Sequence, residues 1–166
     1  MSVYVIKRVQ QLPITLDKAW DFFSSPHNLR EITPAGMDFR ILSDPGIEKI
    51  YAGQVITYKV KPVAGIPVFW MTEITHVKDK EYFIDEQRSG PYSLWRHSHF
   101  FKEIPGGVEM TDLVYYKIPL GILGRFAHWL FVKKQLSSIF DYRYKALEEK
   151  FGKWEKLKQQ VPAHPG

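Results

Sequence analysis

Hydrophobic and polar residues alternate along residues 4–11, and this segment is rich in Val and Ile, so it predicts a β-strand. Thr15 then precedes hydrophobic residues at helical spacing, and we expect it to cap a short helix. A second short helix is predicted around residues 27–32. It ends before Pro34, because the residue preceding a proline is disfavoured in the helical conformation.

After these helices the pattern changes to six segments of alternating hydrophobic and polar residues. The expected strands are residues 38–42, 54–60, 68–78, 81–88, 92–104 and 108–117. The connections between them are short, and short connections join strands that are antiparallel neighbours. The sequence therefore predicts an antiparallel meander that follows one strand and two short helices.

A single long helix is predicted from about residue 124 to residue 158. Its second half carries hydrophobic residues at steps of three or four, a stripe that would pack on the sheet: Leu136, Phe140, Tyr144, Leu147, Phe151 and Trp154. Residues 126–132 are hydrophobic almost all round, so we expect them to border a pocket mouth or to contact another surface. Arg143, beside the stripe, is interpreted as a structural partner for a carboxylate on the sheet.

The strand predicted at residues 92–104 places two histidines on one face. Side chains alternate along a strand, so four of them point to the same side: Trp95, His97, His99 and Phe101. A proline and two glycines at residues 105–107 indicate a hairpin to the next strand. A connection of even length would add Met110, Asp112, Val114 and Tyr116 to this face, whereas an odd length would add Thr111, Leu113 and Tyr115.

In the even registers Asp112 lies opposite or diagonal to His99, within reach of a hydrogen bond between carboxylate and imidazole. Aromatic, imidazole and carboxylate groups on one face indicate a pocket wall. A histidine held by a carboxylate suits either proton transfer or recognition of a polar ligand group. The candidate ligand-binding residues are Trp95, His97, His99, Phe101, Asp112 and Tyr116, and the candidate catalytic residues are His97, His99 and Asp112.

Two histidines two positions apart on a strand could also chelate a metal ion, with Asp112 as a third ligand. Histidine–carboxylate metal sites need further ligands, and none is evident from the spacing, so we expect no metal and no cofactor. The sequence also contains no Gly-x-Ser-x-Gly motif, phosphate loop or dinucleotide fingerprint.

Length, cysteine content and charge limit the kinds of protein that could contain this site. Its 166 residues suffice for one domain with a sizeable core, expected over residues 1–158, with a flexible tail at 159–166. The absence of cysteine excludes thiol catalysis and disulfides and is compatible with the cytoplasmic location that we expect. The net charge of +5 is scattered among acidic residues and forms no basic stripe, so we expect no nucleic-acid partner.

No secretory signal pattern opens the chain. The longest hydrophobic run near the C-terminus, residues 126–132, is interrupted by His128 and is far shorter than the ~20 residues that span a bilayer. We therefore expect a soluble protein without stable membrane insertion.

The order of one strand, two short helices, six strands and one long helix resembles the START/polyketide-cyclase superfamily, also called SRPBCC or Bet v 1-like, over roughly residues 3–152. The resemblance implies an α+β helix-grip fold, in which a curved antiparallel sheet of about seven strands surrounds a long C-terminal helix and leaves a cavity between them. Several motifs resemble a bacterial branch of ligand-binding proteins sometimes labelled cell-division inhibitors: Gly90-Pro91-Tyr92, Trp95-Arg96-His97-Ser98-His99-Phe100, Gly107, Asp112, Tyr115, Pro119, Gly121 and Arg143-Tyr144. This branch implies no agreed reaction.

The leading hypothesis is a protein that binds a hydrophobic or amphipathic small molecule between sheet and helix. The first alternative is an enzyme of the cyclase or dehydratase type that uses His97 or His99 with Asp112 for proton transfer. The second alternative is a protein- or membrane-surface interaction module that acts through residues 126–132. A cavity faced by both histidines would support the first two hypotheses, whereas a filled core with exposed Trp129 and Phe131 would support the third.

Overall fold

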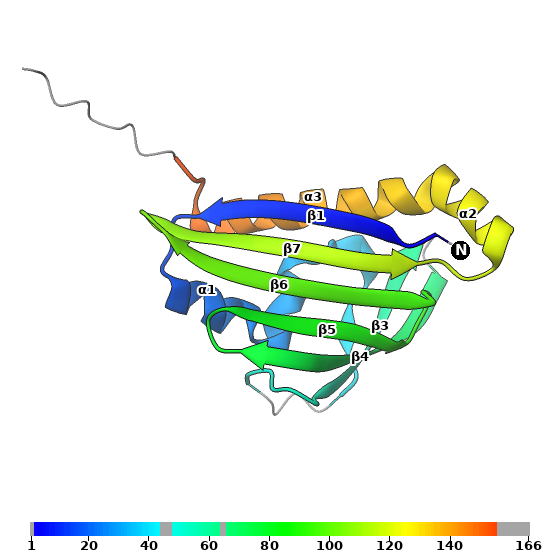
Figure 1. The fold of residues 1–166 in the computed structure, drawn as a ribbon, viewed down its shortest axis with the longest axis horizontal. Helices are drawn as coiled ribbons and strands as arrows, with labels where there is room; N and C mark the ends of the chain where they lie inside the picture. The colour runs from blue at the N-terminus through cyan, green and yellow to red at the C-terminus, as the bar shows by residue number, and fades with distance from the viewer. Residues whose placement is uncertain (1, 44–47, 64–65, 156–166) are drawn as a thin grey trace, which may run out of the picture.

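The computed structural model describes residues 2–43, 48–63 and 66–155, which form one curved antiparallel sheet and a long C-terminal helix (Figure 1). Within these residues the sheet has seven strands in the order β1-β7-β6-β5-β4-β3-β2. They are β1 (Tyr4–Leu12), β2 (Arg40–Ile41), β3 (Val55–Val63), β4 (Ile66–Lys78), β5 (Tyr82–Ser89), β6 (Leu94–Ile104) and β7 (Gly107–Lys117). Consecutive strands from β2 to β7 are neighbours, so the predicted meander is confirmed.

The helices fall into two groups. Those between the first two strands are α1 (Leu16–Phe23), η1 (Pro26–Ile32) and η2 (Ala35–Met37), and those after β7 are α2 (Gly121–Ala127), η3 (His128–Val132) and α3 (Lys133–Phe151). In Figure 1, α3 runs along the sheet beside β1, while α1 and α2 lie at opposite ends of the sheet. This arrangement is the α+β helix-grip fold that the sequence predicts.

The N-terminal helices follow the prediction with one addition. Thr15 caps α1, since the backbone N–H of Lys18 donates to Thr15 Oγ1 at 3.3 Å. The second short helix, η1, is a 3-10 helix, and a further 3-10 turn, η2, begins after Pro34 without having been predicted. Strand β2 has two residues, fewer than predicted, because Asp38 adopts a left-handed backbone conformation with φ of 44° that interrupts the extended chain.

A two-residue turn, Pro105-Gly106, joins β6 to β7. Gly106 has a φ of 90°, a conformation that costs glycine little and other residues much more. The connection is therefore even, and the register places His99 directly opposite Asp112. The even-register version of the predicted strand face is confirmed.

The C-terminal helix differs from the prediction at both ends. It begins at Gly121 and stops at Phe151, and a π-helical turn, η3, interrupts it. The helix stops because the next residue, Gly152, has a φ of 94° and turns the backbone away. Trp154 consequently lies beyond the helix. Residues 156–158 of the predicted helix and the predicted tail at 159–166 lie outside the described residues.

The predicted inward face of α3 is also wrong at one position. The buried members of the predicted stripe are Leu136, Phe140 and Leu147. Tyr144 is 39% exposed, whereas Arg143 is only 8% exposed. Each residue turns a helix by about 100°, so position 143 lies about 20° from the direction of Leu136 and position 144 about 80°. Arg143 takes the inward place and meets the carboxylate of Asp112, which confirms its interpretation as a partner of a sheet carboxylate.

Replacement of Phe140 by alanine tests how far α3 holds the fold. Phe140 is 6% exposed and packs with Val114 of β7 and Leu136 of α3. We expect Phe140→Ala to lower the free energy of unfolding by ~3–5 kcal/mol, a large part of the ~5–15 kcal/mol typical of a domain. Tyr144→Ala is the control and should cost about 1 kcal/mol or less. Urea unfolding gives the free energy of unfolding of both variants. A loss in Phe140→Ala as small as the one expected for the control would show that the helix is peripheral to the core.

Candidate functional site

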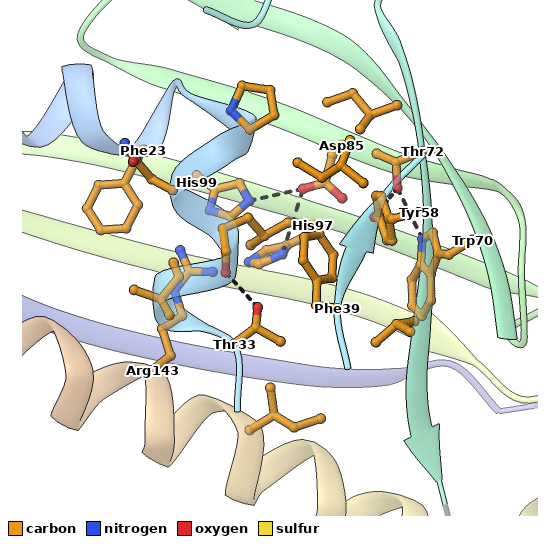
Figure 2. Close-up of a pocket in the computed structure, with 18 of the residues that line it drawn as sticks. Phe23, Thr33, Phe39, Tyr58, Trp70, Thr72, Asp85, His97, His99 and Arg143 are labelled. Carbon is orange, nitrogen blue, oxygen red and sulfur yellow. Dashed lines mark hydrogen bonds and ion pairs between the residues drawn. The ribbon is translucent and has the colours of Figure 1, made fainter. Parts of the chain in front are cut away.

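A cavity of about 210 Å³ lies between the inner face of the sheet, α3 and the segment from α1 to η2 (Figure 2). Its wall is mostly hydrophobic and rich in aromatic side chains: Phe22, Phe23, Phe39, Tyr58, Trp70, Phe83, Tyr92, Trp95 and Phe140. Charged and imidazole side chains gather at one place on the wall, and we call them the polar cluster: Asp85, His97, His99 and Arg143. The volume lies below the ~300–1,000 Å³ typical of drug-sized ligands, so the cavity suits a compact ligand or one end of a longer one.

Beneath the two histidines lies the carboxylate of Asp112 on β7, which is 4% exposed. Its Oδ1 is 2.9 Å from Nε2 of His97 and 2.9 Å from Nδ1 of His99. The first contact is a hydrogen bond, whereas the second is short but too poorly aligned to be one. A guanidinium nitrogen of Arg143 lies 3.4 Å from the same oxygen. Asp112 thus holds groups from β6 and α3 without itself lining the cavity.

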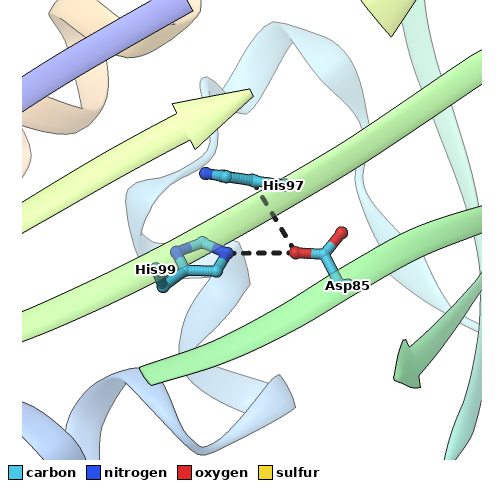
Figure 3. A group of neighbouring side chains, drawn as sticks. All are labelled: Asp85, His97 and His99. Atoms are coloured by element: carbon cyan, nitrogen blue, oxygen red, sulfur yellow. Dashed lines mark hydrogen bonds and ion pairs between the residues drawn. The ribbon is translucent and has the colours of Figure 1, made fainter. Parts of the chain in front are cut away.

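Asp85 of β5 meets the same histidines on their cavity side (Figure 3). Its Oδ2 is hydrogen-bonded to Nε2 of His99 at 3.0 Å and lies 3.7 Å from Nδ1 of His97. Sequence reasoning missed Asp85, although strand alternation puts it on the same face as Phe83, which stacks on the His99 ring at 4.1 Å between centroids. The missing information was the register of β5 and β6, in which Asp85 pairs with His97.

Mutual compensation sets the protonation states in and beneath the polar cluster. Burial alone would raise the pKa of Asp112, but the charge of Arg143 and the two imidazoles hold that pKa well below its usual range. Burial lowers the pKa of His97, and repulsion from His99 acts in the same direction. Burial would also lower the pKa of His99, but its contacts with Asp112 and Asp85 outweigh it and raise the pKa. The lowered pKa of His97 therefore favours its neutral form, whereas the raised pKa of His99 favours its protonated form.

A second polar group faces the cavity from β3 and β4 (Figure 2). Nε1 of Trp70 donates to Oγ1 of Thr72 at 3.1 Å, and the Tyr58 hydroxyl shares a hydrogen bond of 2.6 Å with the same oxygen. Burial raises the pKa of Tyr58, so its hydroxyl stays protonated at neutral pH. These three side chains are hydrogen-bonded to one another, whereas Nε of Arg143 in the polar cluster has no hydrogen-bond partner among the described residues.

The predicted ligand-binding residues divide into two groups. Those in the cavity wall are Trp95, His97 and His99. Asp112 lies beneath the wall, and Phe101 packs edge-to-face on Trp20 in the core near α1, with ring centroids 5.5 Å apart. The Tyr116 hydroxyl is hydrogen-bonded to Nε2 of His128 at 2.8 Å, a contact that sequence reasoning did not foresee. The three candidate catalytic residues are brought into mutual contact, but Phe101 and Tyr116 lie outside the cavity wall.

Comparison with solved structures shows where this fold recurs. A START superfamily protein from Mycobacterium smegmatis matches with a TM-score of 0.66 at 12% identity, over 89% of this chain and 96% of its own. Protein CV1439 from Chromobacterium violaceum matches with a TM-score of 0.69 at 10% identity, over 89% of this chain and 96% of its own. Ginseng major latex-like protein 151 from Panax ginseng matches with a TM-score of 0.65 at 12% identity, over 90% of this chain and 97% of its own. No family model and no curated protein matches the chain. The chain has the START-like helix-grip fold, so the predicted resemblance is confirmed at the level of fold.

Replacing Arg143 tests whether the buried carboxylate of Asp112 depends on the positive charge of Arg143. Arg143→Met keeps much of the side-chain volume but leaves a buried carboxylate without its fixed positive charge. We expect it to lower the free energy of unfolding by ~3–5 kcal/mol at neutral pH. The control is Arg8→Met, because Arg8 is partly exposed and lies 3.7 Å from Asp141 at the surface. The control should cost about 1 kcal/mol or less in the same urea titration.

The pH dependence of stability should change in the same variant. Because the folded pKa of Asp112 is lowered, its contribution to stability is complete above the unfolded value of about 3.9 and is lost as the pH falls through the folded value. Without Arg143 the folded pKa rises, so this loss begins at higher pH. Urea midpoints measured over roughly pH 3–8 report the difference. Parallel pH profiles for the wild type and Arg143→Met would contradict this account.

Proposed function

We propose that the protein binds a hydrophobic or amphipathic small molecule in the cavity between sheet and helix. The observation that supports this most is the contrast within one cavity, whose apolar, aromatic wall carries its charged and imidazole groups at one place. A few convergent polar groups in an apolar cavity orient a ligand and supply specificity. The START-like fold is in general a ligand-binding fold, which supports the same proposal.

The polar cluster suggests which chemical group the ligand carries. Nε of Arg143 is buried and has no hydrogen-bond partner among the described residues. A buried donor without a partner costs ~1–3 kcal/mol, which an oxygen of the ligand would recover. Nδ1 of His97 lies 3.7 Å from Asp85, too far for a hydrogen bond, so this nitrogen also has capacity for a ligand. We expect a carbonyl or hydroxyl oxygen at this end of the ligand.

A cyclase- or dehydratase-type enzyme is the alternative that the same geometry favours. His97 is held through Nε2 by Asp112, and its lowered pKa keeps the ring neutral at pH 7. A neutral, oriented imidazole beside a bound carbonyl compound could accept a proton through Nδ1. Recovery of an unchanged ligand from protein purified from its own host would favour binding, whereas turnover of that ligand would favour catalysis.

A bulky side chain in the cavity should block ligand binding. Ile139 of α3 lines the cavity, whereas the neighbouring Ser138 is exposed on the same helix. With 2-naphthol as a probe, which combines an aromatic body with one hydroxyl, we expect Ile139→Trp to weaken binding at least about tenfold, or about 1.4 kcal/mol. Ser138→Trp is the matched control and should bind as the wild type does. Isothermal titration calorimetry gives both affinities, and equal affinities would contradict a site in the cavity.

A second candidate function concerns the start of the C-terminal helix. Hydrophobic side chains are exposed along this segment: Leu120, Ile122, Leu123, Phe126, Trp129, Leu130 and Phe131. No acidic residue occurs between Asp112 and Asp141. The same segment carries four basic side chains: Lys117, Arg125, Lys133 and Lys134. Exposed apolar side chains beside basic ones suit the interface of an anionic membrane. Among the described helices, none combines the length and hydrophobicity needed to cross a bilayer. This second proposal is therefore docking on an anionic lipid surface.

Vesicle sedimentation tests this second proposal. We expect the protein to bind vesicles that contain phosphatidylglycerol more strongly than vesicles of phosphatidylcholine alone, because the basic side chains add electrostatic attraction. Replacing both Trp129 and Leu130 by serine should reduce the bound fraction several-fold by removing apolar area. The control is Tyr142→Ser, which removes an exposed aromatic side chain from α3. A double variant that binds as the wild type does would contradict docking through this segment.

A further inference from the structure

We propose that Asp85, His97 and His99 form a binding site for one divalent transition-metal ion, Zn²⁺ or Fe²⁺, in the cavity wall. The three side chains converge from β5 and β6 (Figure 3), and one ligand atom of each lies within 4.8 Å of the other two. From the sequence we expected no metal, because no further ligand was evident beside the two histidines and Asp112. Asp85, on the neighbouring strand, supplies the ligand that spacing along the chain could not show.

Two of the three distances between the proposed ligand atoms suit a metal ion with small movements of the side chains, and all three lie within 4.8 Å. Metal–ligand bonds of ~2.0–2.2 Å in tetrahedral geometry put the ligand atoms about 3.3 Å from one another. Oδ2 of Asp85 lies 3.0 Å from Nε2 of His99 and 3.7 Å from Nδ1 of His97, on either side of that value. All three residues sit on paired strands, so their backbones are already fixed at this separation.

The orientation of the two imidazole rings is the strongest support for a metal site. In metal sites, the ring nitrogen that does not bind the metal usually donates its proton to a carboxylate or carbonyl oxygen. Here Oδ1 of Asp112 lies 2.9 Å from Nε2 of His97 and 2.9 Å from Nδ1 of His99. The remaining nitrogens, Nδ1 of His97 and Nε2 of His99, are the two that face Asp85. One buried carboxylate therefore accepts a hydrogen bond from His97 and lies in close contact with His99, and Arg143 neutralises it from the other side.

The ligand set narrows the kind of ion. Two imidazoles and one carboxylate are typical of catalytic zinc and of non-haem Fe²⁺, and both keep open coordination positions. Ca²⁺ and Mg²⁺ prefer sites made of oxygen ligands and fit this set less well. The three proposed ligands line the cavity, so the open positions would face the space where a small molecule would bind. The metal site does not depend on that molecule, because its three ligands come from the chain itself.

Titration of chelator-treated full-length protein with Zn²⁺ alone tests the proposal. Isothermal titration calorimetry should give one Zn²⁺ per chain, and Co²⁺ should give the visible absorption of a four-coordinate site. Asp85→Asn preserves the shape of the side chain but removes its charge, and we expect it to weaken Zn²⁺ binding at least about 100-fold. His76→Ala is the control, because it removes an exposed imidazole of β4, and it should leave the affinity unchanged.

A second variant separates an oriented site from chance binding by histidine. Asp112→Asn keeps all three proposed ligands and should weaken binding about 10–100-fold by releasing the rings. Thermal unfolding in the presence of chelator shows whether each variant is folded, and if Asp112→Asn is not, Asp85→Asn decides alone. Fewer than about half an ion per chain, or wild-type affinity in Asp85→Asn, would overturn the proposal. Binding of 2-naphthol is measured with chelator present, so failure of the metal site and failure of the proposed function remain distinguishable.

Discussion

Compensation of the buried carboxylate of Asp112 is the constraint on which the site depends. Removing a carboxylate from water costs several kcal/mol unless it is paired and hydrogen-bonded. Its partners come from two elements, since His97 and His99 belong to β6 and Arg143 belongs to α3. The helix and the sheet are therefore joined by charge at the place where they enclose the cavity. Hydrophobic packing along α3 holds the fold together, and the charges fix how the two elements meet.

The same carboxylate determines what the cavity presents to a ligand. Because Asp112 engages one nitrogen of each imidazole, the other nitrogens are turned toward Asp85 and the cavity. This orientation suits recognition of a ligand oxygen, and it equally suits coordination of a metal ion. The two proposals are compatible, since an ion held by Asp85, His97 and His99 would offer its open positions to the polar end of a ligand. The aromatic wall would then hold the apolar part of that ligand.

Strand alternation predicts the face shared by His97 and His99, because the period of two is fixed by backbone geometry. The sequence could not choose between even and odd registers, since residues 105–107 permit either, and only the structure shows a two-residue turn. The sequence could not place Asp85 beside the histidines, because its cross-strand partner depends on how β5 and β6 align across an irregular connection. Their pairing ends at Glu86 and Arg96. Tyr144 was wrongly placed on the buried stripe for a different reason, since its hydrophobicity favoured it and the Asp112 that draws Arg143 inward lies on another element. Phe101 and Tyr116 occupy the expected strand faces, but the sheet extends beyond the cavity at both ends and packs them elsewhere.

The central claim is that the space between sheet and helix is a ligand site and not a gap in packing. Native mass spectrometry of the protein purified from its own host under non-denaturing conditions tests this claim most directly. We expect the wild type to carry the mass of a discrete compact organic molecule, which is released on denaturation and is missing from Ile139→Trp. A wild-type protein that carries only the mass of the bare chain, with or without a metal ion, would show that the space between sheet and helix is not a ligand site.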